Sequence, residues 1–153
     1  MKFQTTRTAL LNTILFSSRA ISNRTSQLIL NGVMLDVGEK LTTYSTDLEM
    51  SIKSTTEVNV IEKGKAVVPA RILVNILKSL KESKIELGLD KTTNQIKIVC
   101  GNAVFTLSTL SLEEYPEFPE IKKENYIKIS LKNFINLVTK AKTAASLERA
   151  EQS

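Results

Sequence analysis

The fold is decided by a stretch that occurs twice, as VPARILVNIL at 68–77 and as ISLKNFINLV at 129–138. The two copies align without a gap. In each, the end of a strand leads into a Pro or capping-type residue, a basic residue, two apolar residues, Asn and two more apolar residues. A looser third copy opens the chain, where LLN at 10–12 takes the place of LVN at 73–75 and FIN at 134–136. The regular spacing predicts duplicated strand–helix units, and chance is the alternative because two apolar residues before Asn is a common pattern.

A group of three segments that alternate apolar and polar residues follows the copy at 10–12, and another follows the copy at 68–77. Such alternation is typical of half-buried strands. The groups cover 33–37, 40–46 and 49–54, and then 85–89, 95–99 and 103–107. Helical spacing of apolar residues predicts helices over 7–17, 70–80 and 131–145. The sequence therefore predicts an α+β protein in which each repeat has a strand, a helix and three further strands.

The repeat unit that contains the copy at 129–138 is incomplete. It has a strand from Tyr126 and a helix, but no group of three strands follows before Ser153. Pro116, Pro119 and the acidic run at 113–120 mark the boundary before it. We expect one complete domain at 1–121 and the first strand and helix of a truncated second domain at 122–153, so that the chain is a fragment or a shortened product.

Charge alternates in sign along the chain. The net charge of +5 over 153 residues is distributed as blocks of +4, −4, +5, −4 and +4 over 1–35, 36–62, 63–84, 85–121 and 122–153. The basic blocks contain the predicted helices and the acidic blocks the predicted strands. This pattern predicts a basic helical face opposite an acidic sheet face, which suits a polyanionic partner. For any single block, ordinary solvated charge is the alternative.

Composition argues against several functional classes. Histidine is absent and Cys100 is the single cysteine, so the sequence offers no Ser-His or Cys-His pair and no cysteine-rich metal site. Asp47 and Glu49 flank a turn, which favours a structural Asx turn over a catalytic carboxylate pair. The apolar stretch at 9–16 falls short of the roughly 18 residues that span a membrane. We expect no enzyme activity, no cofactor, no metal, no membrane partner and a reducing, cytoplasmic location.

A set of ordered motifs carries a family resemblance. The motifs are MKF at 1–3, Arg24 followed by LILNGV at 28–33, TDLE at 46–49, VPAR at 68–71, FTLSTL at 105–110 and EYPEFP at 114–119. Together they resemble the bacterial DNA polymerase sliding clamp, the beta subunit of the polymerase III holoenzyme. The resemblance runs along nearly the whole chain and differs by the absence of two prolines after Arg24.

The resemblance implies a DNA-clamp fold of duplicated β-α-β-β-β units, with helices on one face and antiparallel sheets on the other. Three such domains form a chain in this family, and two chains close into a homodimeric ring around duplex DNA. The implied function is that of a processivity factor for DNA replication. The implied partners are double-stranded DNA, the polymerase III catalytic subunit, the clamp loader and a second copy of the chain. The groove that binds the polymerase and the loader lies between the second and third domains, outside this sequence.

The resemblance also implies residues that contact DNA. Arg24 stands at a family position that touches DNA, and Lys140 and Lys142 are the corresponding candidates in the second domain. Arg71 and Lys78 are seven residues apart, so both can point from one helical face. Phosphate contacts from such side chains carry no sequence preference and permit sliding. For Lys140 and Lys142 an ordinary solvated charge is an equal alternative, and Glu148 stands near them where phosphate would be repelled.

Ring closure in the family involves the second helix and the last strand of the first domain. The corresponding residues here are Ile72, Ile76, Asn102, Val104 and Thr106. Ile72 and Ile76 have an equal alternative as core residues. The alternative function, from a different class, is a duplicated α+β binding module whose basic helical face binds RNA or an acidic protein.

Overall fold

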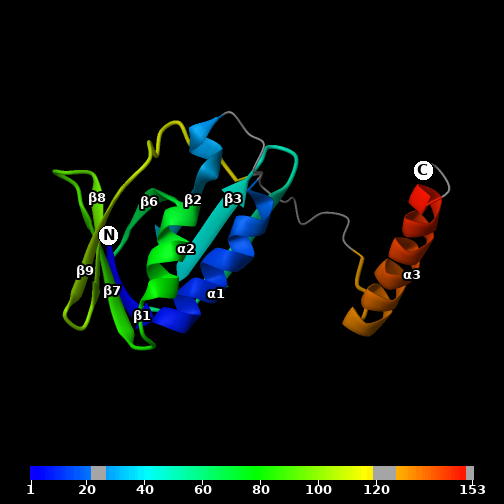
Figure 1. Cartoon of the computed structure of the whole chain (residues 1–153), viewed down its shortest axis with the longest axis horizontal. Helices are drawn as coiled ribbons and strands as arrows, with labels where there is room; N and C mark the ends of the chain where they lie inside the picture. The colour runs from blue at the N-terminus through cyan, green and yellow to red at the C-terminus, as the bar shows by residue number, and fades with distance from the viewer. Residues whose placement is uncertain (22–26, 119–126, 151–153) are drawn as a thin grey trace. The chain divides into compact units, whose positions relative to one another are not determined.

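The computed structural model describes residues 1–21, 27–118 and 127–150. The chain divides into two compact units, Met1–Pro119 and Glu120–Ser153. Among the described residues, the first unit contains two sheets and two α-helices, and the second unit contains one α-helix, as can be followed in Figure 1.

Two antiparallel sheets form the frame of the first unit. The five-stranded sheet has the order β5 (Asn59–Glu62), β1 (Lys2–Thr6), β7 (Lys84–Asp90), β8 (Gln95–Cys100) and β9 (Ala103–Ser108). The four-stranded sheet has the order β4 (Ser51–Thr56), β3 (Leu41–Thr46), β2 (Gly32–Val37) and β6 (Gly64–Pro69). The two predicted groups of three strands are confirmed as β2–β4 and β7–β9. The sequence analysis missed β5 and the first part of β6.

The two repeats exchange their first strands. β1 begins the first repeat but pairs with β7 of the second, with Phe3 opposite Leu87. β6 begins the second repeat but pairs with β2 of the first, with Val68 opposite Val33. Each helix therefore carries the chain from one sheet to the other. This exchange ties the two repeats into a single folding unit.

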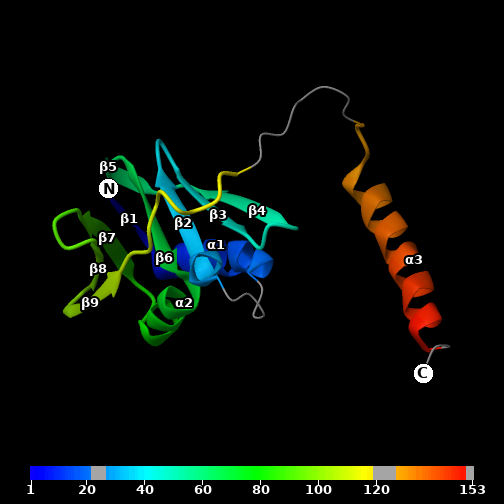
Figure 2. The same cartoon turned by 90° about the horizontal axis from the view of Figure 1, so that it is seen from above.

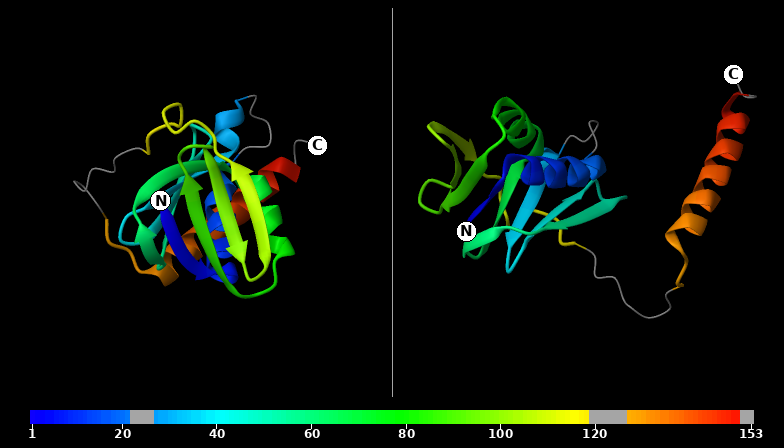
Figure 3. Two further views of the ribbon diagram at one scale, coloured as in Figure 1. Left: turned by 90° about the vertical axis from the view of Figure 1, so that its left-hand side faces the viewer. Right: turned by 90° about the horizontal axis from the view of Figure 1, so that it is seen from below.

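The helix pair, α1 (Arg7–Ser17) and α2 (Ala70–Ser79), packs together on the inner face of the sheets (Figure 3). One apolar core joins the pair to both sheets, and it includes the fully buried side chains of Phe3, Leu10, Ile14, Leu35, Leu73, Leu77, Leu87 and Ile98. Short 3₁₀ turns at Ser18–Ala20 and Leu28–Asn31 follow α1. The predicted helices at 7–17 and 70–80 are confirmed within one residue.

The start of β4 differs from the prediction for a local reason. The strand was expected from residue 49, but it begins at Ser51. The side-chain oxygen Oδ1 of Asp47 accepts hydrogen bonds from the amides of Glu49 and Met50, at 3.1 and 2.8 Å. These bonds hold both residues in an Asx turn and confirm the structural interpretation of Asp47.

A segment that we call the strap, residues 109–118, follows β9 and crosses the four-stranded sheet. It appears in Figure 2 as the yellow trace that runs over β2 and β3. Leu110 forms an isolated antiparallel bridge to Val67 of β6, and its amide donates to the Val67 carbonyl at 2.8 Å. The strap therefore links the edge of one sheet to the other sheet.

The second unit contains α3 (Leu131–Ala150), which is longer than the predicted helix over 131–145. The strand expected before it is absent from 127–130, and Tyr126 lies outside the described residues. A strand needs a neighbour for its backbone hydrogen bonds, and the second unit contains none among the described residues. The repeat positions also differ in burial: Leu73 and Leu77 of α2 are fully buried, whereas their counterparts Phe134 and Val138 are 52% and 49% exposed.

Candidate nucleic-acid interface and subunit edge

α2 presents two cations on its outer side. Leu73, Val74 and Leu77 face the core, while Arg71 and Lys78 are exposed. None of the ion pairs formed within the described residues involves either cation. Neither α1 nor α2 contains an acidic residue. The helix pair therefore forms a surface where an approaching anion meets no fixed negative charge from the helices themselves.

Cations on the sheets differ from those on α2, because acidic neighbours hold several of them. Lys2 lies 2.8 Å from Glu86, and Lys65 lies 3.0 Å from Asp36. The hydrogen bond from Lys2, with a second from Gln4, lowers the pKa of Glu86. Another such pair joins Lys40 and Glu57, and it raises the pKa of Lys40. Lys2, Lys40 and Lys65 therefore have acidic partners, whereas Arg71 and Lys78 have no ion pair within the described residues.

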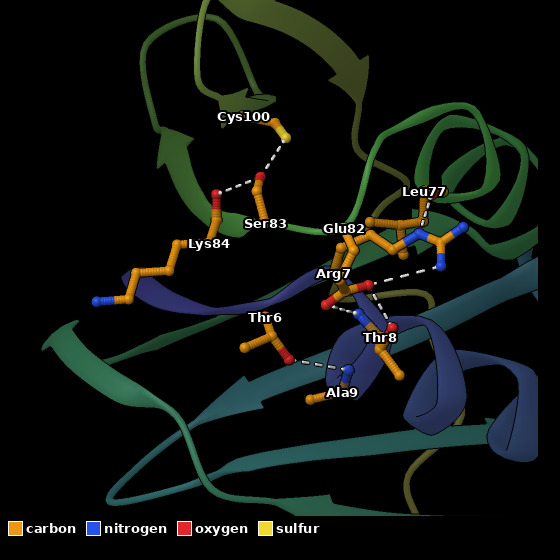
Figure 4. A network of polar contacts seen from close by, with 9 residues as sticks. All are labelled: Thr6, Arg7, Thr8, Ala9, Leu77, Glu82, Ser83, Lys84 and Cys100. Carbon is orange, nitrogen blue, oxygen red and sulfur yellow. Dashed lines mark hydrogen bonds and ion pairs between the residues drawn. The ribbon is translucent and has the colours of Figure 1, made fainter.

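Arg7 belongs to the basic block at the start of the chain, but its guanidinium makes contacts within the first unit (Figure 4). Its Nε donates to the carbonyl of Leu77 at 3.0 Å, and Nη1 lies 3.7 Å from the Glu82 carboxylate. Glu82 in turn accepts hydrogen bonds from the amide and the hydroxyl of Thr8. We call these contacts the clasp, because they tie the start of α1 to the end of α2.

The clasp was missed by sequence reasoning. Its residues are about seventy positions apart, and no local pattern links Arg7 to Leu77 or Glu82. The signal that exists is weak: Arg7 opens a helix, where a cation is unfavourable beside the positive end of the helix dipole. A cation at this position suggests a partner elsewhere in the chain, but the sequence does not identify that partner.

The remaining predicted DNA contacts are Arg24, Lys140 and Lys142. Arg24 lies outside the described residues. Lys140 and Lys142 are exposed on α3, in the second unit. All three assignments stay predictions.

The predicted subunit edge lies on β9 and α2, which contact each other. β9 is an edge strand, and Val104 and Thr106 on it are exposed, as is Asn102 in the preceding turn. Ile72 is 50% exposed and Val104 is 54% exposed. Ile76 is half-buried against the core. The structure thus separates the two isoleucines: Ile72 is available to a partner, and Ile76 contributes to the core.

The structure also shows the surroundings of Cys100, the single cysteine of the chain. Cys100 is half-buried, and its Sγ lies 2.9 Å from the Ser83 hydroxyl (Figure 4). Among the described residues, no three His, Cys, Asp or Glu side chains are grouped so that they could hold a metal ion. None of the described helices is both long and apolar enough to cross a membrane.

The fold is that of DNA polymerase sliding clamps. The first unit resembles the DNA polymerase III subunit beta of Pseudomonas aeruginosa with a TM-score of 0.72 and 31% identity, over 78% of this chain and 33% of that one. It resembles the sliding clamp of Bacillus subtilis with a TM-score of 0.76 and 26% identity, over 82% and 35%. The predicted α+β clamp fold is confirmed.

Sequence comparison gives the family. Residues 1–119 match the model of the DNA polymerase III beta subunit, N-terminal domain, and the chain belongs to this family. A beta sliding clamp of Staphylococcus epidermidis is 30% identical in an alignment of length 155 that covers 95% of this chain and 41% of that protein. One of Streptomyces coelicolor is 31% identical over 122 residues, which are 79% and 32%. The chain thus spans less than half the length of these relatives.

Proposed function

We propose that this chain acts as the DNA-encircling part of a sliding clamp, a non-catalytic processivity factor in replication. One observation carries the proposal: Arg71 and Lys78 lie exposed on an acid-free helix pair, while sheet cations such as Lys2 and Lys65 are paired. Unpaired Lys and Arg side chains on long stems attract phosphates without reading bases. A surface of this kind holds a duplex loosely enough to slide.

The partners follow from the family and are part of the proposal. They are double-stranded DNA, the polymerase III catalytic subunit, a clamp loader and a second copy closing a ring. Ile72, Asn102, Val104 and Thr106 supply the ring edge on this chain, with Ile76 supporting Ile72's helix from the core side. We place the protein in the cytoplasm, where the chromosome is replicated. A binding module for RNA or an acidic protein has no comparable support, since the relatives are sliding clamps.

We also infer that residues 122–153 begin a second clamp domain. Two observations support this. The segment at 129–138 repeats the α2 segment at 68–77, and the similarity to the Staphylococcus epidermidis clamp covers 95% of the chain, beyond the first unit. Lys140 and Lys142 on α3 are then its DNA-facing candidates, as Arg24 is in the first domain.

The proposal is tested by duplex binding to this chain, measured by fluorescence anisotropy over a range of salt. Replacing both Arg71 and Lys78 with Gln should weaken binding and reduce the slope of log K against log salt by about 1 per side chain. The matched control is Lys91→Gln with Lys97→Gln, which removes the same charge from the β7–β8 turn and from β8. Equal losses in both double variants would mean that binding follows net charge alone and would refute the assignment.

A further inference from the structure

The strap contacts the strands of the four-stranded sheet in their spatial order. Leu110 bridges to Val67 of β6. The hydroxyl of Tyr115 donates to the carbonyls of Gly32 in β2 and Tyr44 in β3, at 3.0 and 3.2 Å. The sheet order is β4-β3-β2-β6, so the six residues from Leu110 to Tyr115 cross from the β6 edge to β3.

The far end of the strap is held by an aromatic cluster. The ring of Phe118 packs against Tyr44 with centroids 5.1 Å apart and a tilt of 52°. The Lys53 ammonium of β4 lies 5.5 Å from the Tyr44 ring and 6.0 Å from the Phe118 ring. Tyr44 and Lys53 are directly opposite each other in the sheet. Tilted aromatic pairs and cation–π contacts of this size each contribute modestly, which suits a contact that can open.

The middle of the strap is seated more firmly. Tyr115 is buried, with 7% of its surface exposed. Gly32 makes room for this seat: a Cβ there would lie 2.6 Å from a Val67 methyl and 3.0 Å from a Leu110 methyl. The strap therefore has a firm attachment at Leu110 and Tyr115 and a weaker one at Phe118. The attachment of the strap is thus weakest at its C-terminal end.

We propose that the strap is a latch: when closed it fixes where the chain leaves the first unit, beside β3 and β4, and it opens from its Phe118 end without unfolding the sheets. Opening between Tyr115 and Phe118 adds up to roughly 10 Å of free chain, at about 3.3–3.6 Å per residue. The latch thus controls the reach between the first unit and α3. This inference does not depend on DNA binding, so the two proposals can fail separately.

Amide hydrogen exchange tests the order of opening. Phe118→Ala and Lys53→Gln should leave exchange of the Leu110, Tyr115 and β2–β3 amides within about twofold, because these residues stay seated while the Phe118 end opens. Tyr115→Phe should speed exchange along the whole strap. The matched controls are Phe16→Ala, an exposed aromatic residue on α1, and Lys97→Gln. The melting temperature of the Phe118 and Lys53 variants should stay within about 3 °C of the parent chain.

A distance measurement tests the consequence. In a Cys100→Ser background, spin labels at Thr55→Cys on β4 and Asn136→Cys on α3 report the separation of the two units. Adding Phe118→Ala should extend the distance distribution by up to roughly 10 Å at its long end. An unchanged distribution, or faster exchange at Tyr115 and in β2–β3 when Phe118 is replaced, would each overturn the latch.

Discussion

Single residues on the first unit separate into those that the fold uses and those that it leaves available. Arg7 and Arg71 illustrate the difference. Both are basic and both stand in the first turn of a helix, yet Arg7 bonds the Leu77 carbonyl whereas Arg71 has no ion pair within the described residues. The net charge of a sequence block includes the two arginines equally. Only burial and partners show that Arg7 supports structure and that Arg71 remains exposed.

Tyr115 gives the first unit a dependence on alkaline pH. Burial raises the pKa of its phenol to about 12, against a smaller opposing effect of a hydrogen bond with the Met34 backbone. Because the folded state favours the neutral phenol, this stabilisation is complete below pH 10 and is lost as the pH rises from 10 to 12. We expect the stability difference between the parent and Tyr115→Phe to shrink over that range.

The measurement is urea unfolding followed by circular dichroism, at several pH values between 8 and 11.5. At pH 8 Tyr115→Phe should be less stable by about 1 kcal/mol, since two carbonyls lose their donor. The two proteins differ only at residue 115, so the difference isolates Tyr115. A difference that stays constant with pH would show that the phenol has the same pKa in the folded and unfolded states, and would contradict the prediction.

At the scale of elements, helical periodicity located α1 and α2 within one residue, but contacts between elements depend on residues far apart in the chain. The clasp joins the first turn of α1 to the last turn of α2 and the turn that follows it. It supplies a cation at the carbonyl end of α2 and a carboxylate at the amide end of α1, which both helix dipoles favour. The two helices that carry the candidate DNA surface are thereby held at a fixed offset.

Removing the clasp should loosen the helix pair. Arg7→Met keeps the aliphatic stem and should cost about 1–2 kcal/mol of unfolding free energy, because the Leu77 carbonyl and Glu82 lose a charged donor. Arg19→Met is the matched control, since Arg19 is exposed and lies over the Phe16 ring; its cost should stay within about 0.5 kcal/mol. Chemical denaturation of the three proteins measures the difference, and equal costs would rule out the clasp as a distinct support.

On the scale of the whole molecule, the chain combines a closed unit with an exposed helix. Exchange of β1 and β6 closes the first unit around one core. In α3 the residues that match the core face of α2 are exposed within the second unit. An amphipathic helix gains most of its stability from packing this face. The sequence repeat therefore predicts the helix, whereas the second unit by itself does not bury the apolar face of α3.

Ring formation is tested with a chimera in which residues 1–118 replace the matched part of the Bacillus subtilis clamp. It should be retained on nicked circular DNA after loading by that organism's loader, and released when the DNA is cut. Adding Ile72→Ser and Val104→Ser, both at half-exposed positions, should reduce retention by tenfold or more while changing stability by less than about 1 kcal/mol. Lys97→Gln in the same chimera is the control.

The outcomes of this assay separate the proposals. Retention on linear DNA as well as circular DNA would indicate ordinary electrostatic binding and no closed ring. Full retention in the Ile72 and Val104 double variant would remove these residues from the interface. Failure of a folded, dimeric chimera to stay on circular DNA would contradict the clamp function of this first unit.

Local patterns in the sequence were enough for the helices, for six of the strands, for the two repeats and for the family, since each rests on neighbours or on motif order. Tertiary structure alone decided the strand exchange, the clasp, the path of the strap and which of Ile72 and Ile76 faces solvent. The physical reason is that periodicity is set over a few residues, by the turn of a helix or the pleat of a strand. The contacts of Arg7 with Leu77, or of Tyr115 with Gly32, join residues seventy or more positions apart and exist only once the core has formed.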